Sequence, residues 1–485
     1  MDWFAAPEYW LAREVCQSLI AALYVIAFVA AARQFRALIG EHGMLPVPRH
    51  LARAGFRRSP SLFHWRYSDR LFAGVSWTGA LLSAALAAGA DDLVPPAAAI
   101  ALWLLLWALY LSIVNVGQTW YAFGWESLLL EAGFLAAFLG NGDLAPPVLG
   151  MWLLRWLLFR VEFGAGLIKW RGDACWRELT CLYYHHETQP MPGPLSWFFH
   201  HLPRPLHRVE AAANHAVQLV VPFGLFLPQP GATVAALLIT VTQLWLVLSG
   251  NFAWLNWLTI ALALSAVDTT RLSALPAPPS FGDQPLWYQG LLAALTALVL
   301  ALSWWPVRNL ISPRQRMNFS FNRLHLVNAY GAFGSVNRIR YEIVVEGTTE
   351  FPPDRHTRWH PYGFKGKPGE LRRMPRQFAP YHLRLDWLMW FAAISPDYAR
   401  PWFAPFVARL LVNDPDTLRL LRHNPFPDRP PACVRARLYR YRFTHPRQLR
   451  SDGAWWERTP VREYLPPVTI EDLAHLAPRH RRGRQ

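Results

Sequence analysis

The chain has 485 residues, of which 53% are hydrophobic, and a formal net charge of +16 at pH 7. Its four cysteines are too few for a disulfide-stabilised scaffold, and its length suits two or three domains. Residues 311–485 hold 30 basic and 15 acidic groups, but the arginines alternate with aromatic and aliphatic residues instead of forming a basic stripe, so we expect no nucleic-acid partner.

Hydrophobic segments over residues 1–310 predict a multi-pass α-helical membrane protein whose first partner is the lipid bilayer. Several of them reach the ~20 residues that a helix needs to cross a hydrocarbon core. Asp2, Glu8 and Glu14 precede or interrupt the first segment, so we expect it to remain rather than to be cleaved as a signal peptide. We expect eight or nine spans, near residues 15–33, 71–90, 97–114, 121–140, 147–168, 214–228, 232–249, 252–267 and 287–305.

Charged residues interrupt the fourth and fifth expected spans, where each costs about 2.5–3.5 kcal/mol at mid-bilayer. They are Glu126, Glu131, Arg155, Arg160 and Glu162. Counted outward from a turn at residues 141–146, Glu131 and Arg155 lie at matching depths. Glu126 and Arg160 do likewise. The cluster is therefore either two buried ion pairs that fix the helix register, or a polar cavity for a substrate or for protons.

A polar loop, residues 169–208, follows the fifth span. Its first part reads KWRGDACWRELTCLYYHHETQPMPGP, without helical or strand periodicity. Irregular backbone near lipid needs protein or water partners, so we expect the function to be built around this loop. Cys175 and Cys181 are close enough to form a disulfide in an oxidising compartment, or they are two separate buried thiols.

Two further features of this region have alternative interpretations. Lys169 either extends its ammonium group to the lipid head groups or is desolvated and acts as a base. His207 and Glu210 are three residues apart, a spacing found in metal ligands, and Asn214 and His215 follow them. No second paired motif accompanies them and capping explains them equally well, so we predict no metal site and no cofactor.

From about residue 311 the pattern predicts a soluble, strand-rich α+β domain over residues 311–465. Alternating residues indicate half-buried strands at 338–346 and 433–444, and helical periodicity indicates helices at 383–394 and 401–412. The basic tail, 466–485, is predicted to be disordered. With the expected spans, the polar loop and this domain share one side of the membrane.

Several ungapped motifs resemble the lipase maturation factor family of polytopic membrane proteins. They are KWRGDACWRELTC and ETQPMPGPLSWFFHHLP in the loop, NAYGAFGSVNRIRYEIVVEG from Asn328, YGFKGKPGELRRMP from Tyr362, RLDWLMWFAA from Arg384 and HNPFPDRPPACVRARLYRYRFT from His423. The similarity covers most of residues 150–465. The loop departs from the pattern expected of the family at His186 and Gly193.

The resemblance implies a maturation factor in the endoplasmic reticulum membrane that helps dimeric secreted lipases to fold and assemble, with the C-terminal domain facing the lumen and contacting the client. It implies no cofactor. Arginine outnumbers lysine 45 to 3, which suggests a bacterial-type member in an inner membrane. Expected client-binding or structural residues of the loop are Arg171, Asp173, Cys175, Trp176, Cys181, His185, Glu187 and Gln189, and those of the C-terminal motif are Arg384, Asp386 and Trp387.

The end of the fifth span also resembles, over a few residues, the membrane enzymes related to vitamin K-dependent carboxylase. The residues that carry this resemblance are GLIKW and a tryptophan shortly after it. In those enzymes a lysine at the corresponding place is the catalytic base, so the resemblance implies Lys169 as a base acting on a lipid-like substrate. The sequence thus offers two hypotheses: a maturation factor that performs no catalysis, or a carboxylase-related membrane enzyme.

Overall fold

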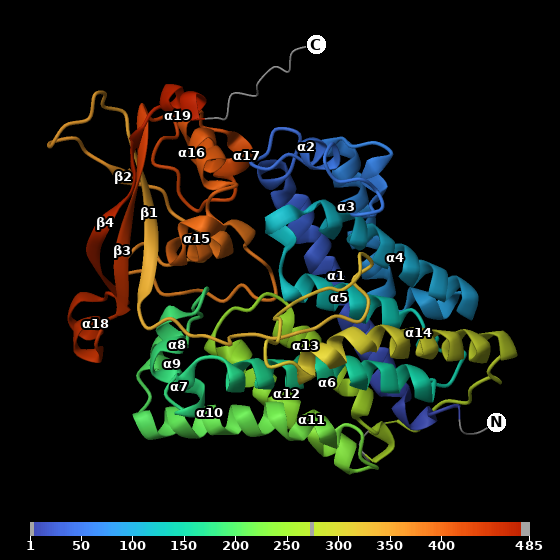
Figure 1. Cartoon of the computed structure of the whole chain (residues 1–485). Coiled ribbons are helices and arrows are strands. Elements are labelled where there is room, and N and C mark those ends of the chain that lie inside the picture. The colour runs from blue at the N-terminus through green and yellow to red at the C-terminus, as the bar shows by residue number, and fades with distance from the viewer. Residues whose placement is uncertain (1–3, 272–275, 477–485) are drawn as a thin grey trace.

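A large helical part and a smaller C-terminal part pack against each other in the computed structural model, which describes residues 4–271 and 276–476 (Figure 1). Most of their buried hydrophobic side chains form one core that extends through both parts. At the contact between the two parts, for example, the ring centroids of Trp120 and Trp402 lie 5.4 Å apart, and both side chains are fully buried. The two parts are therefore packed together rather than joined by a flexible linker.

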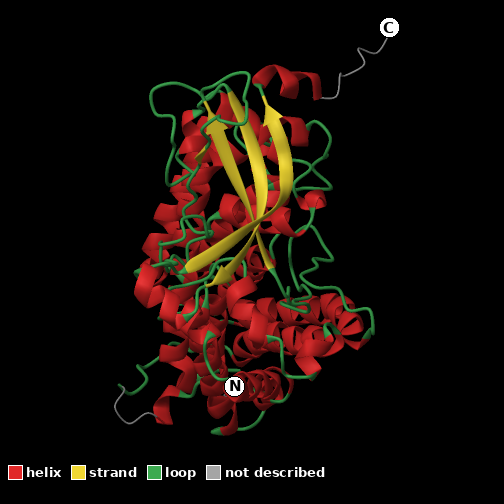
Figure 2. Cartoon of the chain, turned by 90° about the vertical axis from the view of Figure 1, so that its left-hand side faces the viewer, coloured by secondary structure: helices red, strands yellow, loops and turns green. Residues whose placement is uncertain are grey.

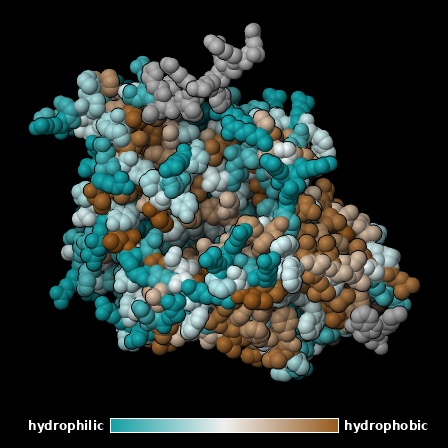
Figure 3. All heavy atoms as spheres, in the orientation of Figure 1, coloured by the Kyte–Doolittle hydropathy of each residue, from teal (hydrophilic) through white to brown (hydrophobic). Residues whose placement is uncertain are grey.

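Within the described residues, five helices are long and apolar enough to cross a membrane. They are α1 (Trp10–Leu38), α3 (Asp69–Ala87), α4 (Pro96–Val116), α12 (Gly231–Ser249) and α14 (Leu286–Ile311). On the face shown in Figure 3, hydrophobic residues gather over the helical part, whereas the surface of the sheet-containing part is mostly hydrophilic. This distribution suits a protein whose helical part lies in a bilayer and whose C-terminal part lies in water.

The expected count of eight or nine spans is not confirmed. α5 (Gly124–Ala136) has 13 residues and α13 (Leu255–Ala263) has 9, both too short to cross a bilayer. α10 (Arg204–Leu219) is amphipathic and ends within the expected span 214–228. α6 (Val148–Arg171) is long enough but carries four buried charged side chains, because it lies in the interior of the helical part.

The other helices of the described chain are short. They are α2 (Val47–Leu51), α7 (Ala174–Arg177), α8 (Leu182–Thr188), α9 (Ser196–His200), α11 (Val221–Gly224), α15 (Arg384–Ile394), α16 (Phe403–Leu411), α17 (Pro415–Leu418), α18 (Pro446–Asp452) and α19 (Ile470–Leu476). α15 and α16 confirm the two helices predicted for the C-terminal domain.

The C-terminal part contains a four-stranded antiparallel sheet in the order β2-β1-β3-β4. The strands are β1 (Arg340–Thr348), β2 (His360–Pro361), β3 (Cys433–Phe443) and β4 (Trp456–Val468). In the register of β1 and β3, Ile343 lies opposite Leu438. Figure 2 shows the sheet in front, with α15 and α16 behind it.

Both predicted strands are confirmed, but β1 is not half-buried as expected. Arg340 and Glu342, placed on its polar face, are 1% and 0% exposed, because the polar loop and the helices cover both faces of the strand. β4 was not predicted. It contains three prolines and lies at the edge of the sheet, where a missing backbone N–H costs no ladder hydrogen bond.

The tail predicted to be disordered is partly ordered. Residues 466–468 complete β4 and α19 follows directly, with the side chain of Leu473 buried in the core. The contact of Leu473 with the core is enough to order this segment, although the composition of the segment is polar. The remainder of the predicted tail, 477–485, lies outside the described residues.

Candidate functional site

The polar loop folds into three short helices, α7, α8 and α9, and is not irregular as its sequence indicated. These helices have 4, 7 and 5 residues, too few for a periodic pattern to be recognised. Most of the residues expected at the site are buried. They are Cys175, Trp176, Cys181, His185, Glu187 and Gln189, each at most 9% exposed. Their side chains therefore contact the protein's own interior rather than solvent.

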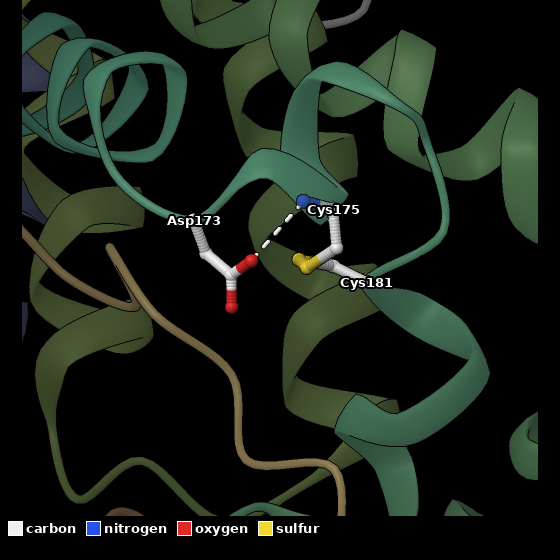
Figure 4. Close-up of side chains that lie close together, drawn as sticks. All are labelled: Asp173, Cys175 and Cys181. Carbon is white, nitrogen blue, oxygen red and sulfur yellow. Dashed lines mark hydrogen bonds between the residues drawn. A yellow bond between two sulfur atoms is a disulfide. The ribbon is translucent and has the colours of Figure 1, made fainter.

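A disulfide joins Cys175 in α7 to Cys181, the residue that precedes α8, with Cα atoms 4.8 Å apart (Figure 4). Asp173 lies beside it, and its Oδ1 accepts a hydrogen bond from the backbone nitrogen of Cys175 at 3.1 Å, which caps α7. Of the two alternatives left open by the sequence, the structure contains the bridge. A structural disulfide of this kind is typical of proteins in oxidising compartments.

The loop is bound to the segment that leads into β1. Arg338 forms an ion pair with Asp173, with Nη2 2.8 Å from Oδ1. The hydrogen bonds from this guanidinium hold the pKa of Asp173 below its ordinary value. The Asp173 backbone nitrogen also donates to the carbonyl of Gly334 at 2.8 Å, and Nε1 of Trp176 donates to that of Phe333 at 2.7 Å.

Arg340 makes a second, buried connection between the loop and the sheet. Its guanidinium pairs with Glu342 at 2.6 Å and donates to the loop carbonyls of Glu187 and Pro190 at 3.0 and 3.1 Å. In return, the Glu187 carboxylate accepts a hydrogen bond from the backbone nitrogen of Phe443 in β3 at 2.8 Å. Because of these contacts, the loop and the C-terminal domain form one structural unit.

Two other loop residues bind the ends of apolar helices. Nε2 of Gln189 donates to the carbonyl of Ser249, the last residue of α12, at 2.8 Å. Nη1 of Arg171 donates to the carbonyls of Leu310 and Ser312, at the C-terminus of α14, at 2.7 and 3.1 Å. A cation at this end satisfies carbonyls that have no partner within the helix. The loop is thus attached to the helical part as firmly as to the sheet.

Lys169 points into the protein and does not extend towards lipid head groups. Its side chain is 5% exposed, and Nζ donates to Oδ1 of Asn214 and Oε1 of Gln218, both at 2.8 Å. The ammonium group also lies 5.0 Å from the centroid of the Trp176 ring. Burial lowers the pKa of Lys169 to about 8. Two amide oxygens and an aromatic face hold the cation in a structural contact between α6 and α10.

Glu131 pairs with Arg160 and not with Arg155, the partner expected from matching depths. The pair is buried and also binds the segment that precedes β1. Oε2 of Glu131 accepts hydrogen bonds from the backbone nitrogen of Asn328 at 2.9 Å and from the hydroxyl of Tyr330 at 2.7 Å, while Nη1 of Arg160 donates to the Asn328 carbonyl at 2.7 Å. The cluster is therefore filled by protein groups and leaves no polar cavity at these atoms.

Glu126 also has a partner other than the expected Arg160. It pairs with Arg384 at the start of α15, with Oε1 2.5 Å from Nη1, and both side chains are fully buried. Arg384 donates in addition to the carbonyl of Trp120 at 2.7 Å, and the hydroxyl of Tyr110 donates to Glu126. A charge of the helical part and a charge of the C-terminal motif thus meet in one buried pair.

The two remaining charges of the cluster have neutral partners. Nε of Arg155 donates to the carbonyl of Ser265 at 3.0 Å. Glu162 accepts hydrogen bonds from the side-chain amides of Gln243 and Gln218 at 2.6 and 3.2 Å. These contacts connect α6 to α10, α12 and the residues after α13. The cluster therefore fixes the packing of the helical part, with a single ion pair between α5 and α6.

The other two residues of the C-terminal motif differ in their contacts: Asp386 binds a turn within the C-terminal part, and Trp387 packs against the helical part. Oδ1 of Asp386 accepts hydrogen bonds from the backbone nitrogens of Gly366 and Lys367 at 2.7 and 3.1 Å. The Trp387 ring packs edge-on against Trp125 of α5, with centroids 4.9 Å apart. The motif therefore positions α15 against the helical part.

Two groups of side chains within the described residues have the composition of a metal site. The first contains Asp173 and the two bridged cysteines, whose disulfide removes the thiolates that would bind a metal. The second contains His186 of α8 with His207 and Glu210 of α10, whose ligand atoms lie within 4.8 Å of one another. The sequence predicted no metal site, because no second paired motif accompanies His207 and Glu210. His186 comes from a different helix.

Comparisons with known proteins cover almost the whole chain. The model of the lipase maturation factor transmembrane domain matches residues 11–274, and that of the lipase maturation factor C-terminal domain matches residues 326–466. The chain belongs to the lipase maturation factor family. It is 41% identical to lipase maturation factor 1 of Bos taurus and 40% identical to that of Homo sapiens, over 96% of this chain and 91% and 89% of those proteins.

Lipase maturation factor 2 of Homo sapiens is more distant, with 29% identity over 95% of this chain and 83% of that protein. No solved structure matches the chain significantly. The relatives named here are animal proteins, so the comparisons do not support the expected bacterial-type member or its inner-membrane location. They also give no support to the carboxylase resemblance.

Four residues that hold the family's loop and helices in place were not among the predicted site residues. They are Asn328, Tyr330, Arg338 and Arg340. All lie in the run NAYGAFGSVNRIR, at the start of the match to the C-terminal domain of the lipase maturation factors. The family motif that contains these residues could have identified them, whereas their spacing alone does not indicate a site.

Proposed function

We propose that this protein is a membrane-embedded maturation factor that helps secreted lipases to fold and assemble. The observation that carries the proposal is the similarity to lipase maturation factors over nearly the whole chain, including both the transmembrane and the C-terminal domains. The contacts of Arg338 and Arg340 with the loop support a single client-holding unit formed by the loop and the C-terminal domain.

The proposed location is the endoplasmic reticulum membrane, with the loop and the C-terminal domain in the lumen. The five apolar helices are long enough to hold the protein in a bilayer. The disulfide between Cys175 and Cys181 supports an oxidising compartment for the loop. The C-terminal domain has to share that compartment, because it contacts the loop directly.

The proposed client surface is a groove at the contact between the loop and the C-terminal domain, with a cavity volume of about 270 Å³. It is lined by Asn337, Arg338, Ile339, Arg340, Tyr341, Trp390 and Ile394. Ile394 is 43% exposed, and Nε1 of Trp390 donates to the loop carbonyl of Thr188 at 3.1 Å. Apolar and aromatic side chains beside two arginines suit an extended apolar segment of an incompletely folded lipase.

The test is rescue of a dimeric secreted lipase in cells that lack their own lipase maturation factor. Expression of the chain is expected to restore lipase activity per mass of secreted lipase, and Ile394→Arg is expected to abolish the gain. Val461→Arg on β4, where the side chain is 47% exposed and outside the groove, is the matched control and is expected to rescue fully. Absence of rescue by the wild-type chain, at normal expression and membrane insertion, would refute the function. Full rescue by Ile394→Arg would refute the groove alone.

A further inference from the structure

Three polar side chains from α8 and α10 lie close together, and the atoms that face one another have no hydrogen-bond partners. Oε2 of Glu210 lies 3.8 Å from Nε2 of His186 and 3.8 Å from Nδ1 of His207, beyond hydrogen-bond distance. His186 and His207 have side chains only 1% and 2% exposed. A buried polar atom without a partner costs about 1–3 kcal/mol, so this group needs an explanation.

Surrounding hydrogen bonds orient two of these side chains, His207 and Glu210, whereas both ring nitrogens of His186 have no hydrogen-bond partner. Nε2 of His207 faces the carbonyl of His200 at 3.4 Å, which places the N–H on Nε2 and leaves a lone pair on Nδ1. Oε1 of Glu210 accepts a hydrogen bond from Nε1 of Trp245 in α12 at 2.7 Å, which leaves Oε2 free. In metal sites, a ligating side chain is typically held by a hydrogen bond to the ring nitrogen or carboxylate oxygen that does not bind the metal.

We propose that His186, His207 and Glu210 bind a divalent transition-metal ion, and that zinc is the metal that suits them best. Two imidazoles and one carboxylate form a usual zinc ligand set, with bond lengths of about 2.0–2.2 Å and ligand atoms about 3.4 Å apart in a tetrahedral site. Side-chain shifts of about 1 Å would bring the three ligand atoms from within 4.8 Å of one another to that separation. A fourth position is left for water.

The bound ion would connect α8 to α10. Glu210 has a side-chain exposure of 16%, which provides a path for the ion from solvent. The site does not include any residue of the proposed client groove. Its test does not depend on lipase maturation, so the two proposals fail separately.

The experiment measures zinc binding to the full-length protein, purified in detergent with a histidine-free tag, stripped with EDTA and kept free of reductant. We expect one zinc ion per chain, removable by EDTA, and a rise in the melting temperature on zinc addition, since a ligand that binds only the folded state stabilises it. His207→Ala, Glu210→Gln and His186→Phe are each expected to weaken binding about 100-fold or more, and Trp245→Phe about 10-fold.

His201→Gln is the matched control, because His201 lies nearby but its Nδ1 is bonded to the carbonyl of Trp197 at 2.8 Å. This variant is expected to bind zinc as the wild type does. Should a ligand variant fail to fold, Trp245→Phe and the wild-type titration still decide the question. The proposal is overturned if the wild type binds no saturating zinc, or if His201→Gln weakens binding as much as Glu210→Gln.

Discussion

The helical part is joined to the C-terminal part in two regions that differ in exposure. We call the first the buried junction: the Glu126–Arg384 pair together with Glu131, Arg160, Asn328 and Tyr330. We call the second the loop seam: the Asp173–Arg338 pair and the contacts of Arg340 with the loop carbonyls. The charged side chains of the buried junction are at most 2% exposed, whereas in the loop seam Arg340 is buried but the Arg338 side chain is 41% exposed. If one charge of the buried junction is removed, water therefore cannot take its place beside the remaining partner.

The largest effect is expected from breaking the buried junction at one side. Arg384→Met leaves the carboxylate of Glu126 buried without its cation, which typically costs about 3–5 kcal/mol. His382, with Nδ1 3.7 Å from the same carboxylate, is too far away to replace the lost hydrogen bond. The apparent melting temperature in detergent is expected to fall by several degrees, and trypsin is expected to release the C-terminal part earlier than in the wild type.

Two further variants test whether the fall in melting temperature comes from the unpaired buried charge or from the loss of an arginine side chain. The double variant Glu126→Gln with Arg384→Met removes both charges and is expected to recover much of the loss. Arg400→Met breaks the exposed pair with Asp397, whose side chains are 80% and 71% exposed, and is expected to leave the melting temperature unchanged. An Arg384→Met protein as stable as Arg400→Met would show that the junction contributes no more than a surface pair.

The buried junction also shows what the sequence can and cannot predict. Charges in apolar segments correctly indicated buried polar contacts in the helical part. The predicted partners of these charges were wrong, because pairing by equal distance from the turn requires α5 and α6 to form a simple hairpin. α5 ends at Ala136, before the expected turn, and Glu126 pairs with a residue 258 positions away. A partner at that separation follows from the tertiary fold, and no local spacing contains it.

The strands and the loop show the opposite case, in which local pattern was informative. Alternation identified β1 and β3, and the spacing of Cys175 and Cys181 allowed the disulfide that the structure contains. Burial was not predicted, since alternation reports which residues share a face but not what covers the polar face. For the same reason the proximity of His186 to His207 and Glu210 was not predicted, because His186 reaches α10 only through the packing of α8.

The second-largest effect is expected in the loop seam, on removal of the disulfide. Cys175→Ser with Cys181→Ser opens a short ring, and losses of about 2–4 kcal/mol are typical of native disulfides. Because the contacts of Arg340 remain, we expect local opening of α7 and faster proteolysis between residues 173 and 181, with the C-terminal part still attached. If trypsin released the C-terminal part equally fast from this variant and from Arg384→Met, the loop seam and the buried junction would not differ as expected.

A smaller effect is expected from Arg340→Met, which removes the donor to the loop carbonyls. The carbonyls of Glu187 and Pro190 lose a buried partner, at a cost of about 1–3 kcal/mol. Glu342 keeps a cation, because Nζ of Lys367 lies 2.8 Å from its Oε2. The loss should therefore be smaller than for Arg384→Met in the same melting experiment. Adding Lys367→Met to this variant is expected to increase the loss to that of a broken buried pair.

The smallest effect is expected at the Asp173–Arg338 pair, and it should depend on pH and salt. Asp173→Asn keeps an oxygen that can cap α7 but removes the charge, so we expect a loss of at most about 1 kcal/mol, reduced further in 1 M salt. The pKa of Asp173 is lowered in the folded state, so the contribution of the pair is present above the unfolded pKa of about 3.9 and is lost as the pH falls through the lower, folded value. Melting temperatures of the wild type and Asp173→Asn should differ at pH 7 and converge below about pH 4. A difference that persists in acid would assign the effect to capping rather than to charge.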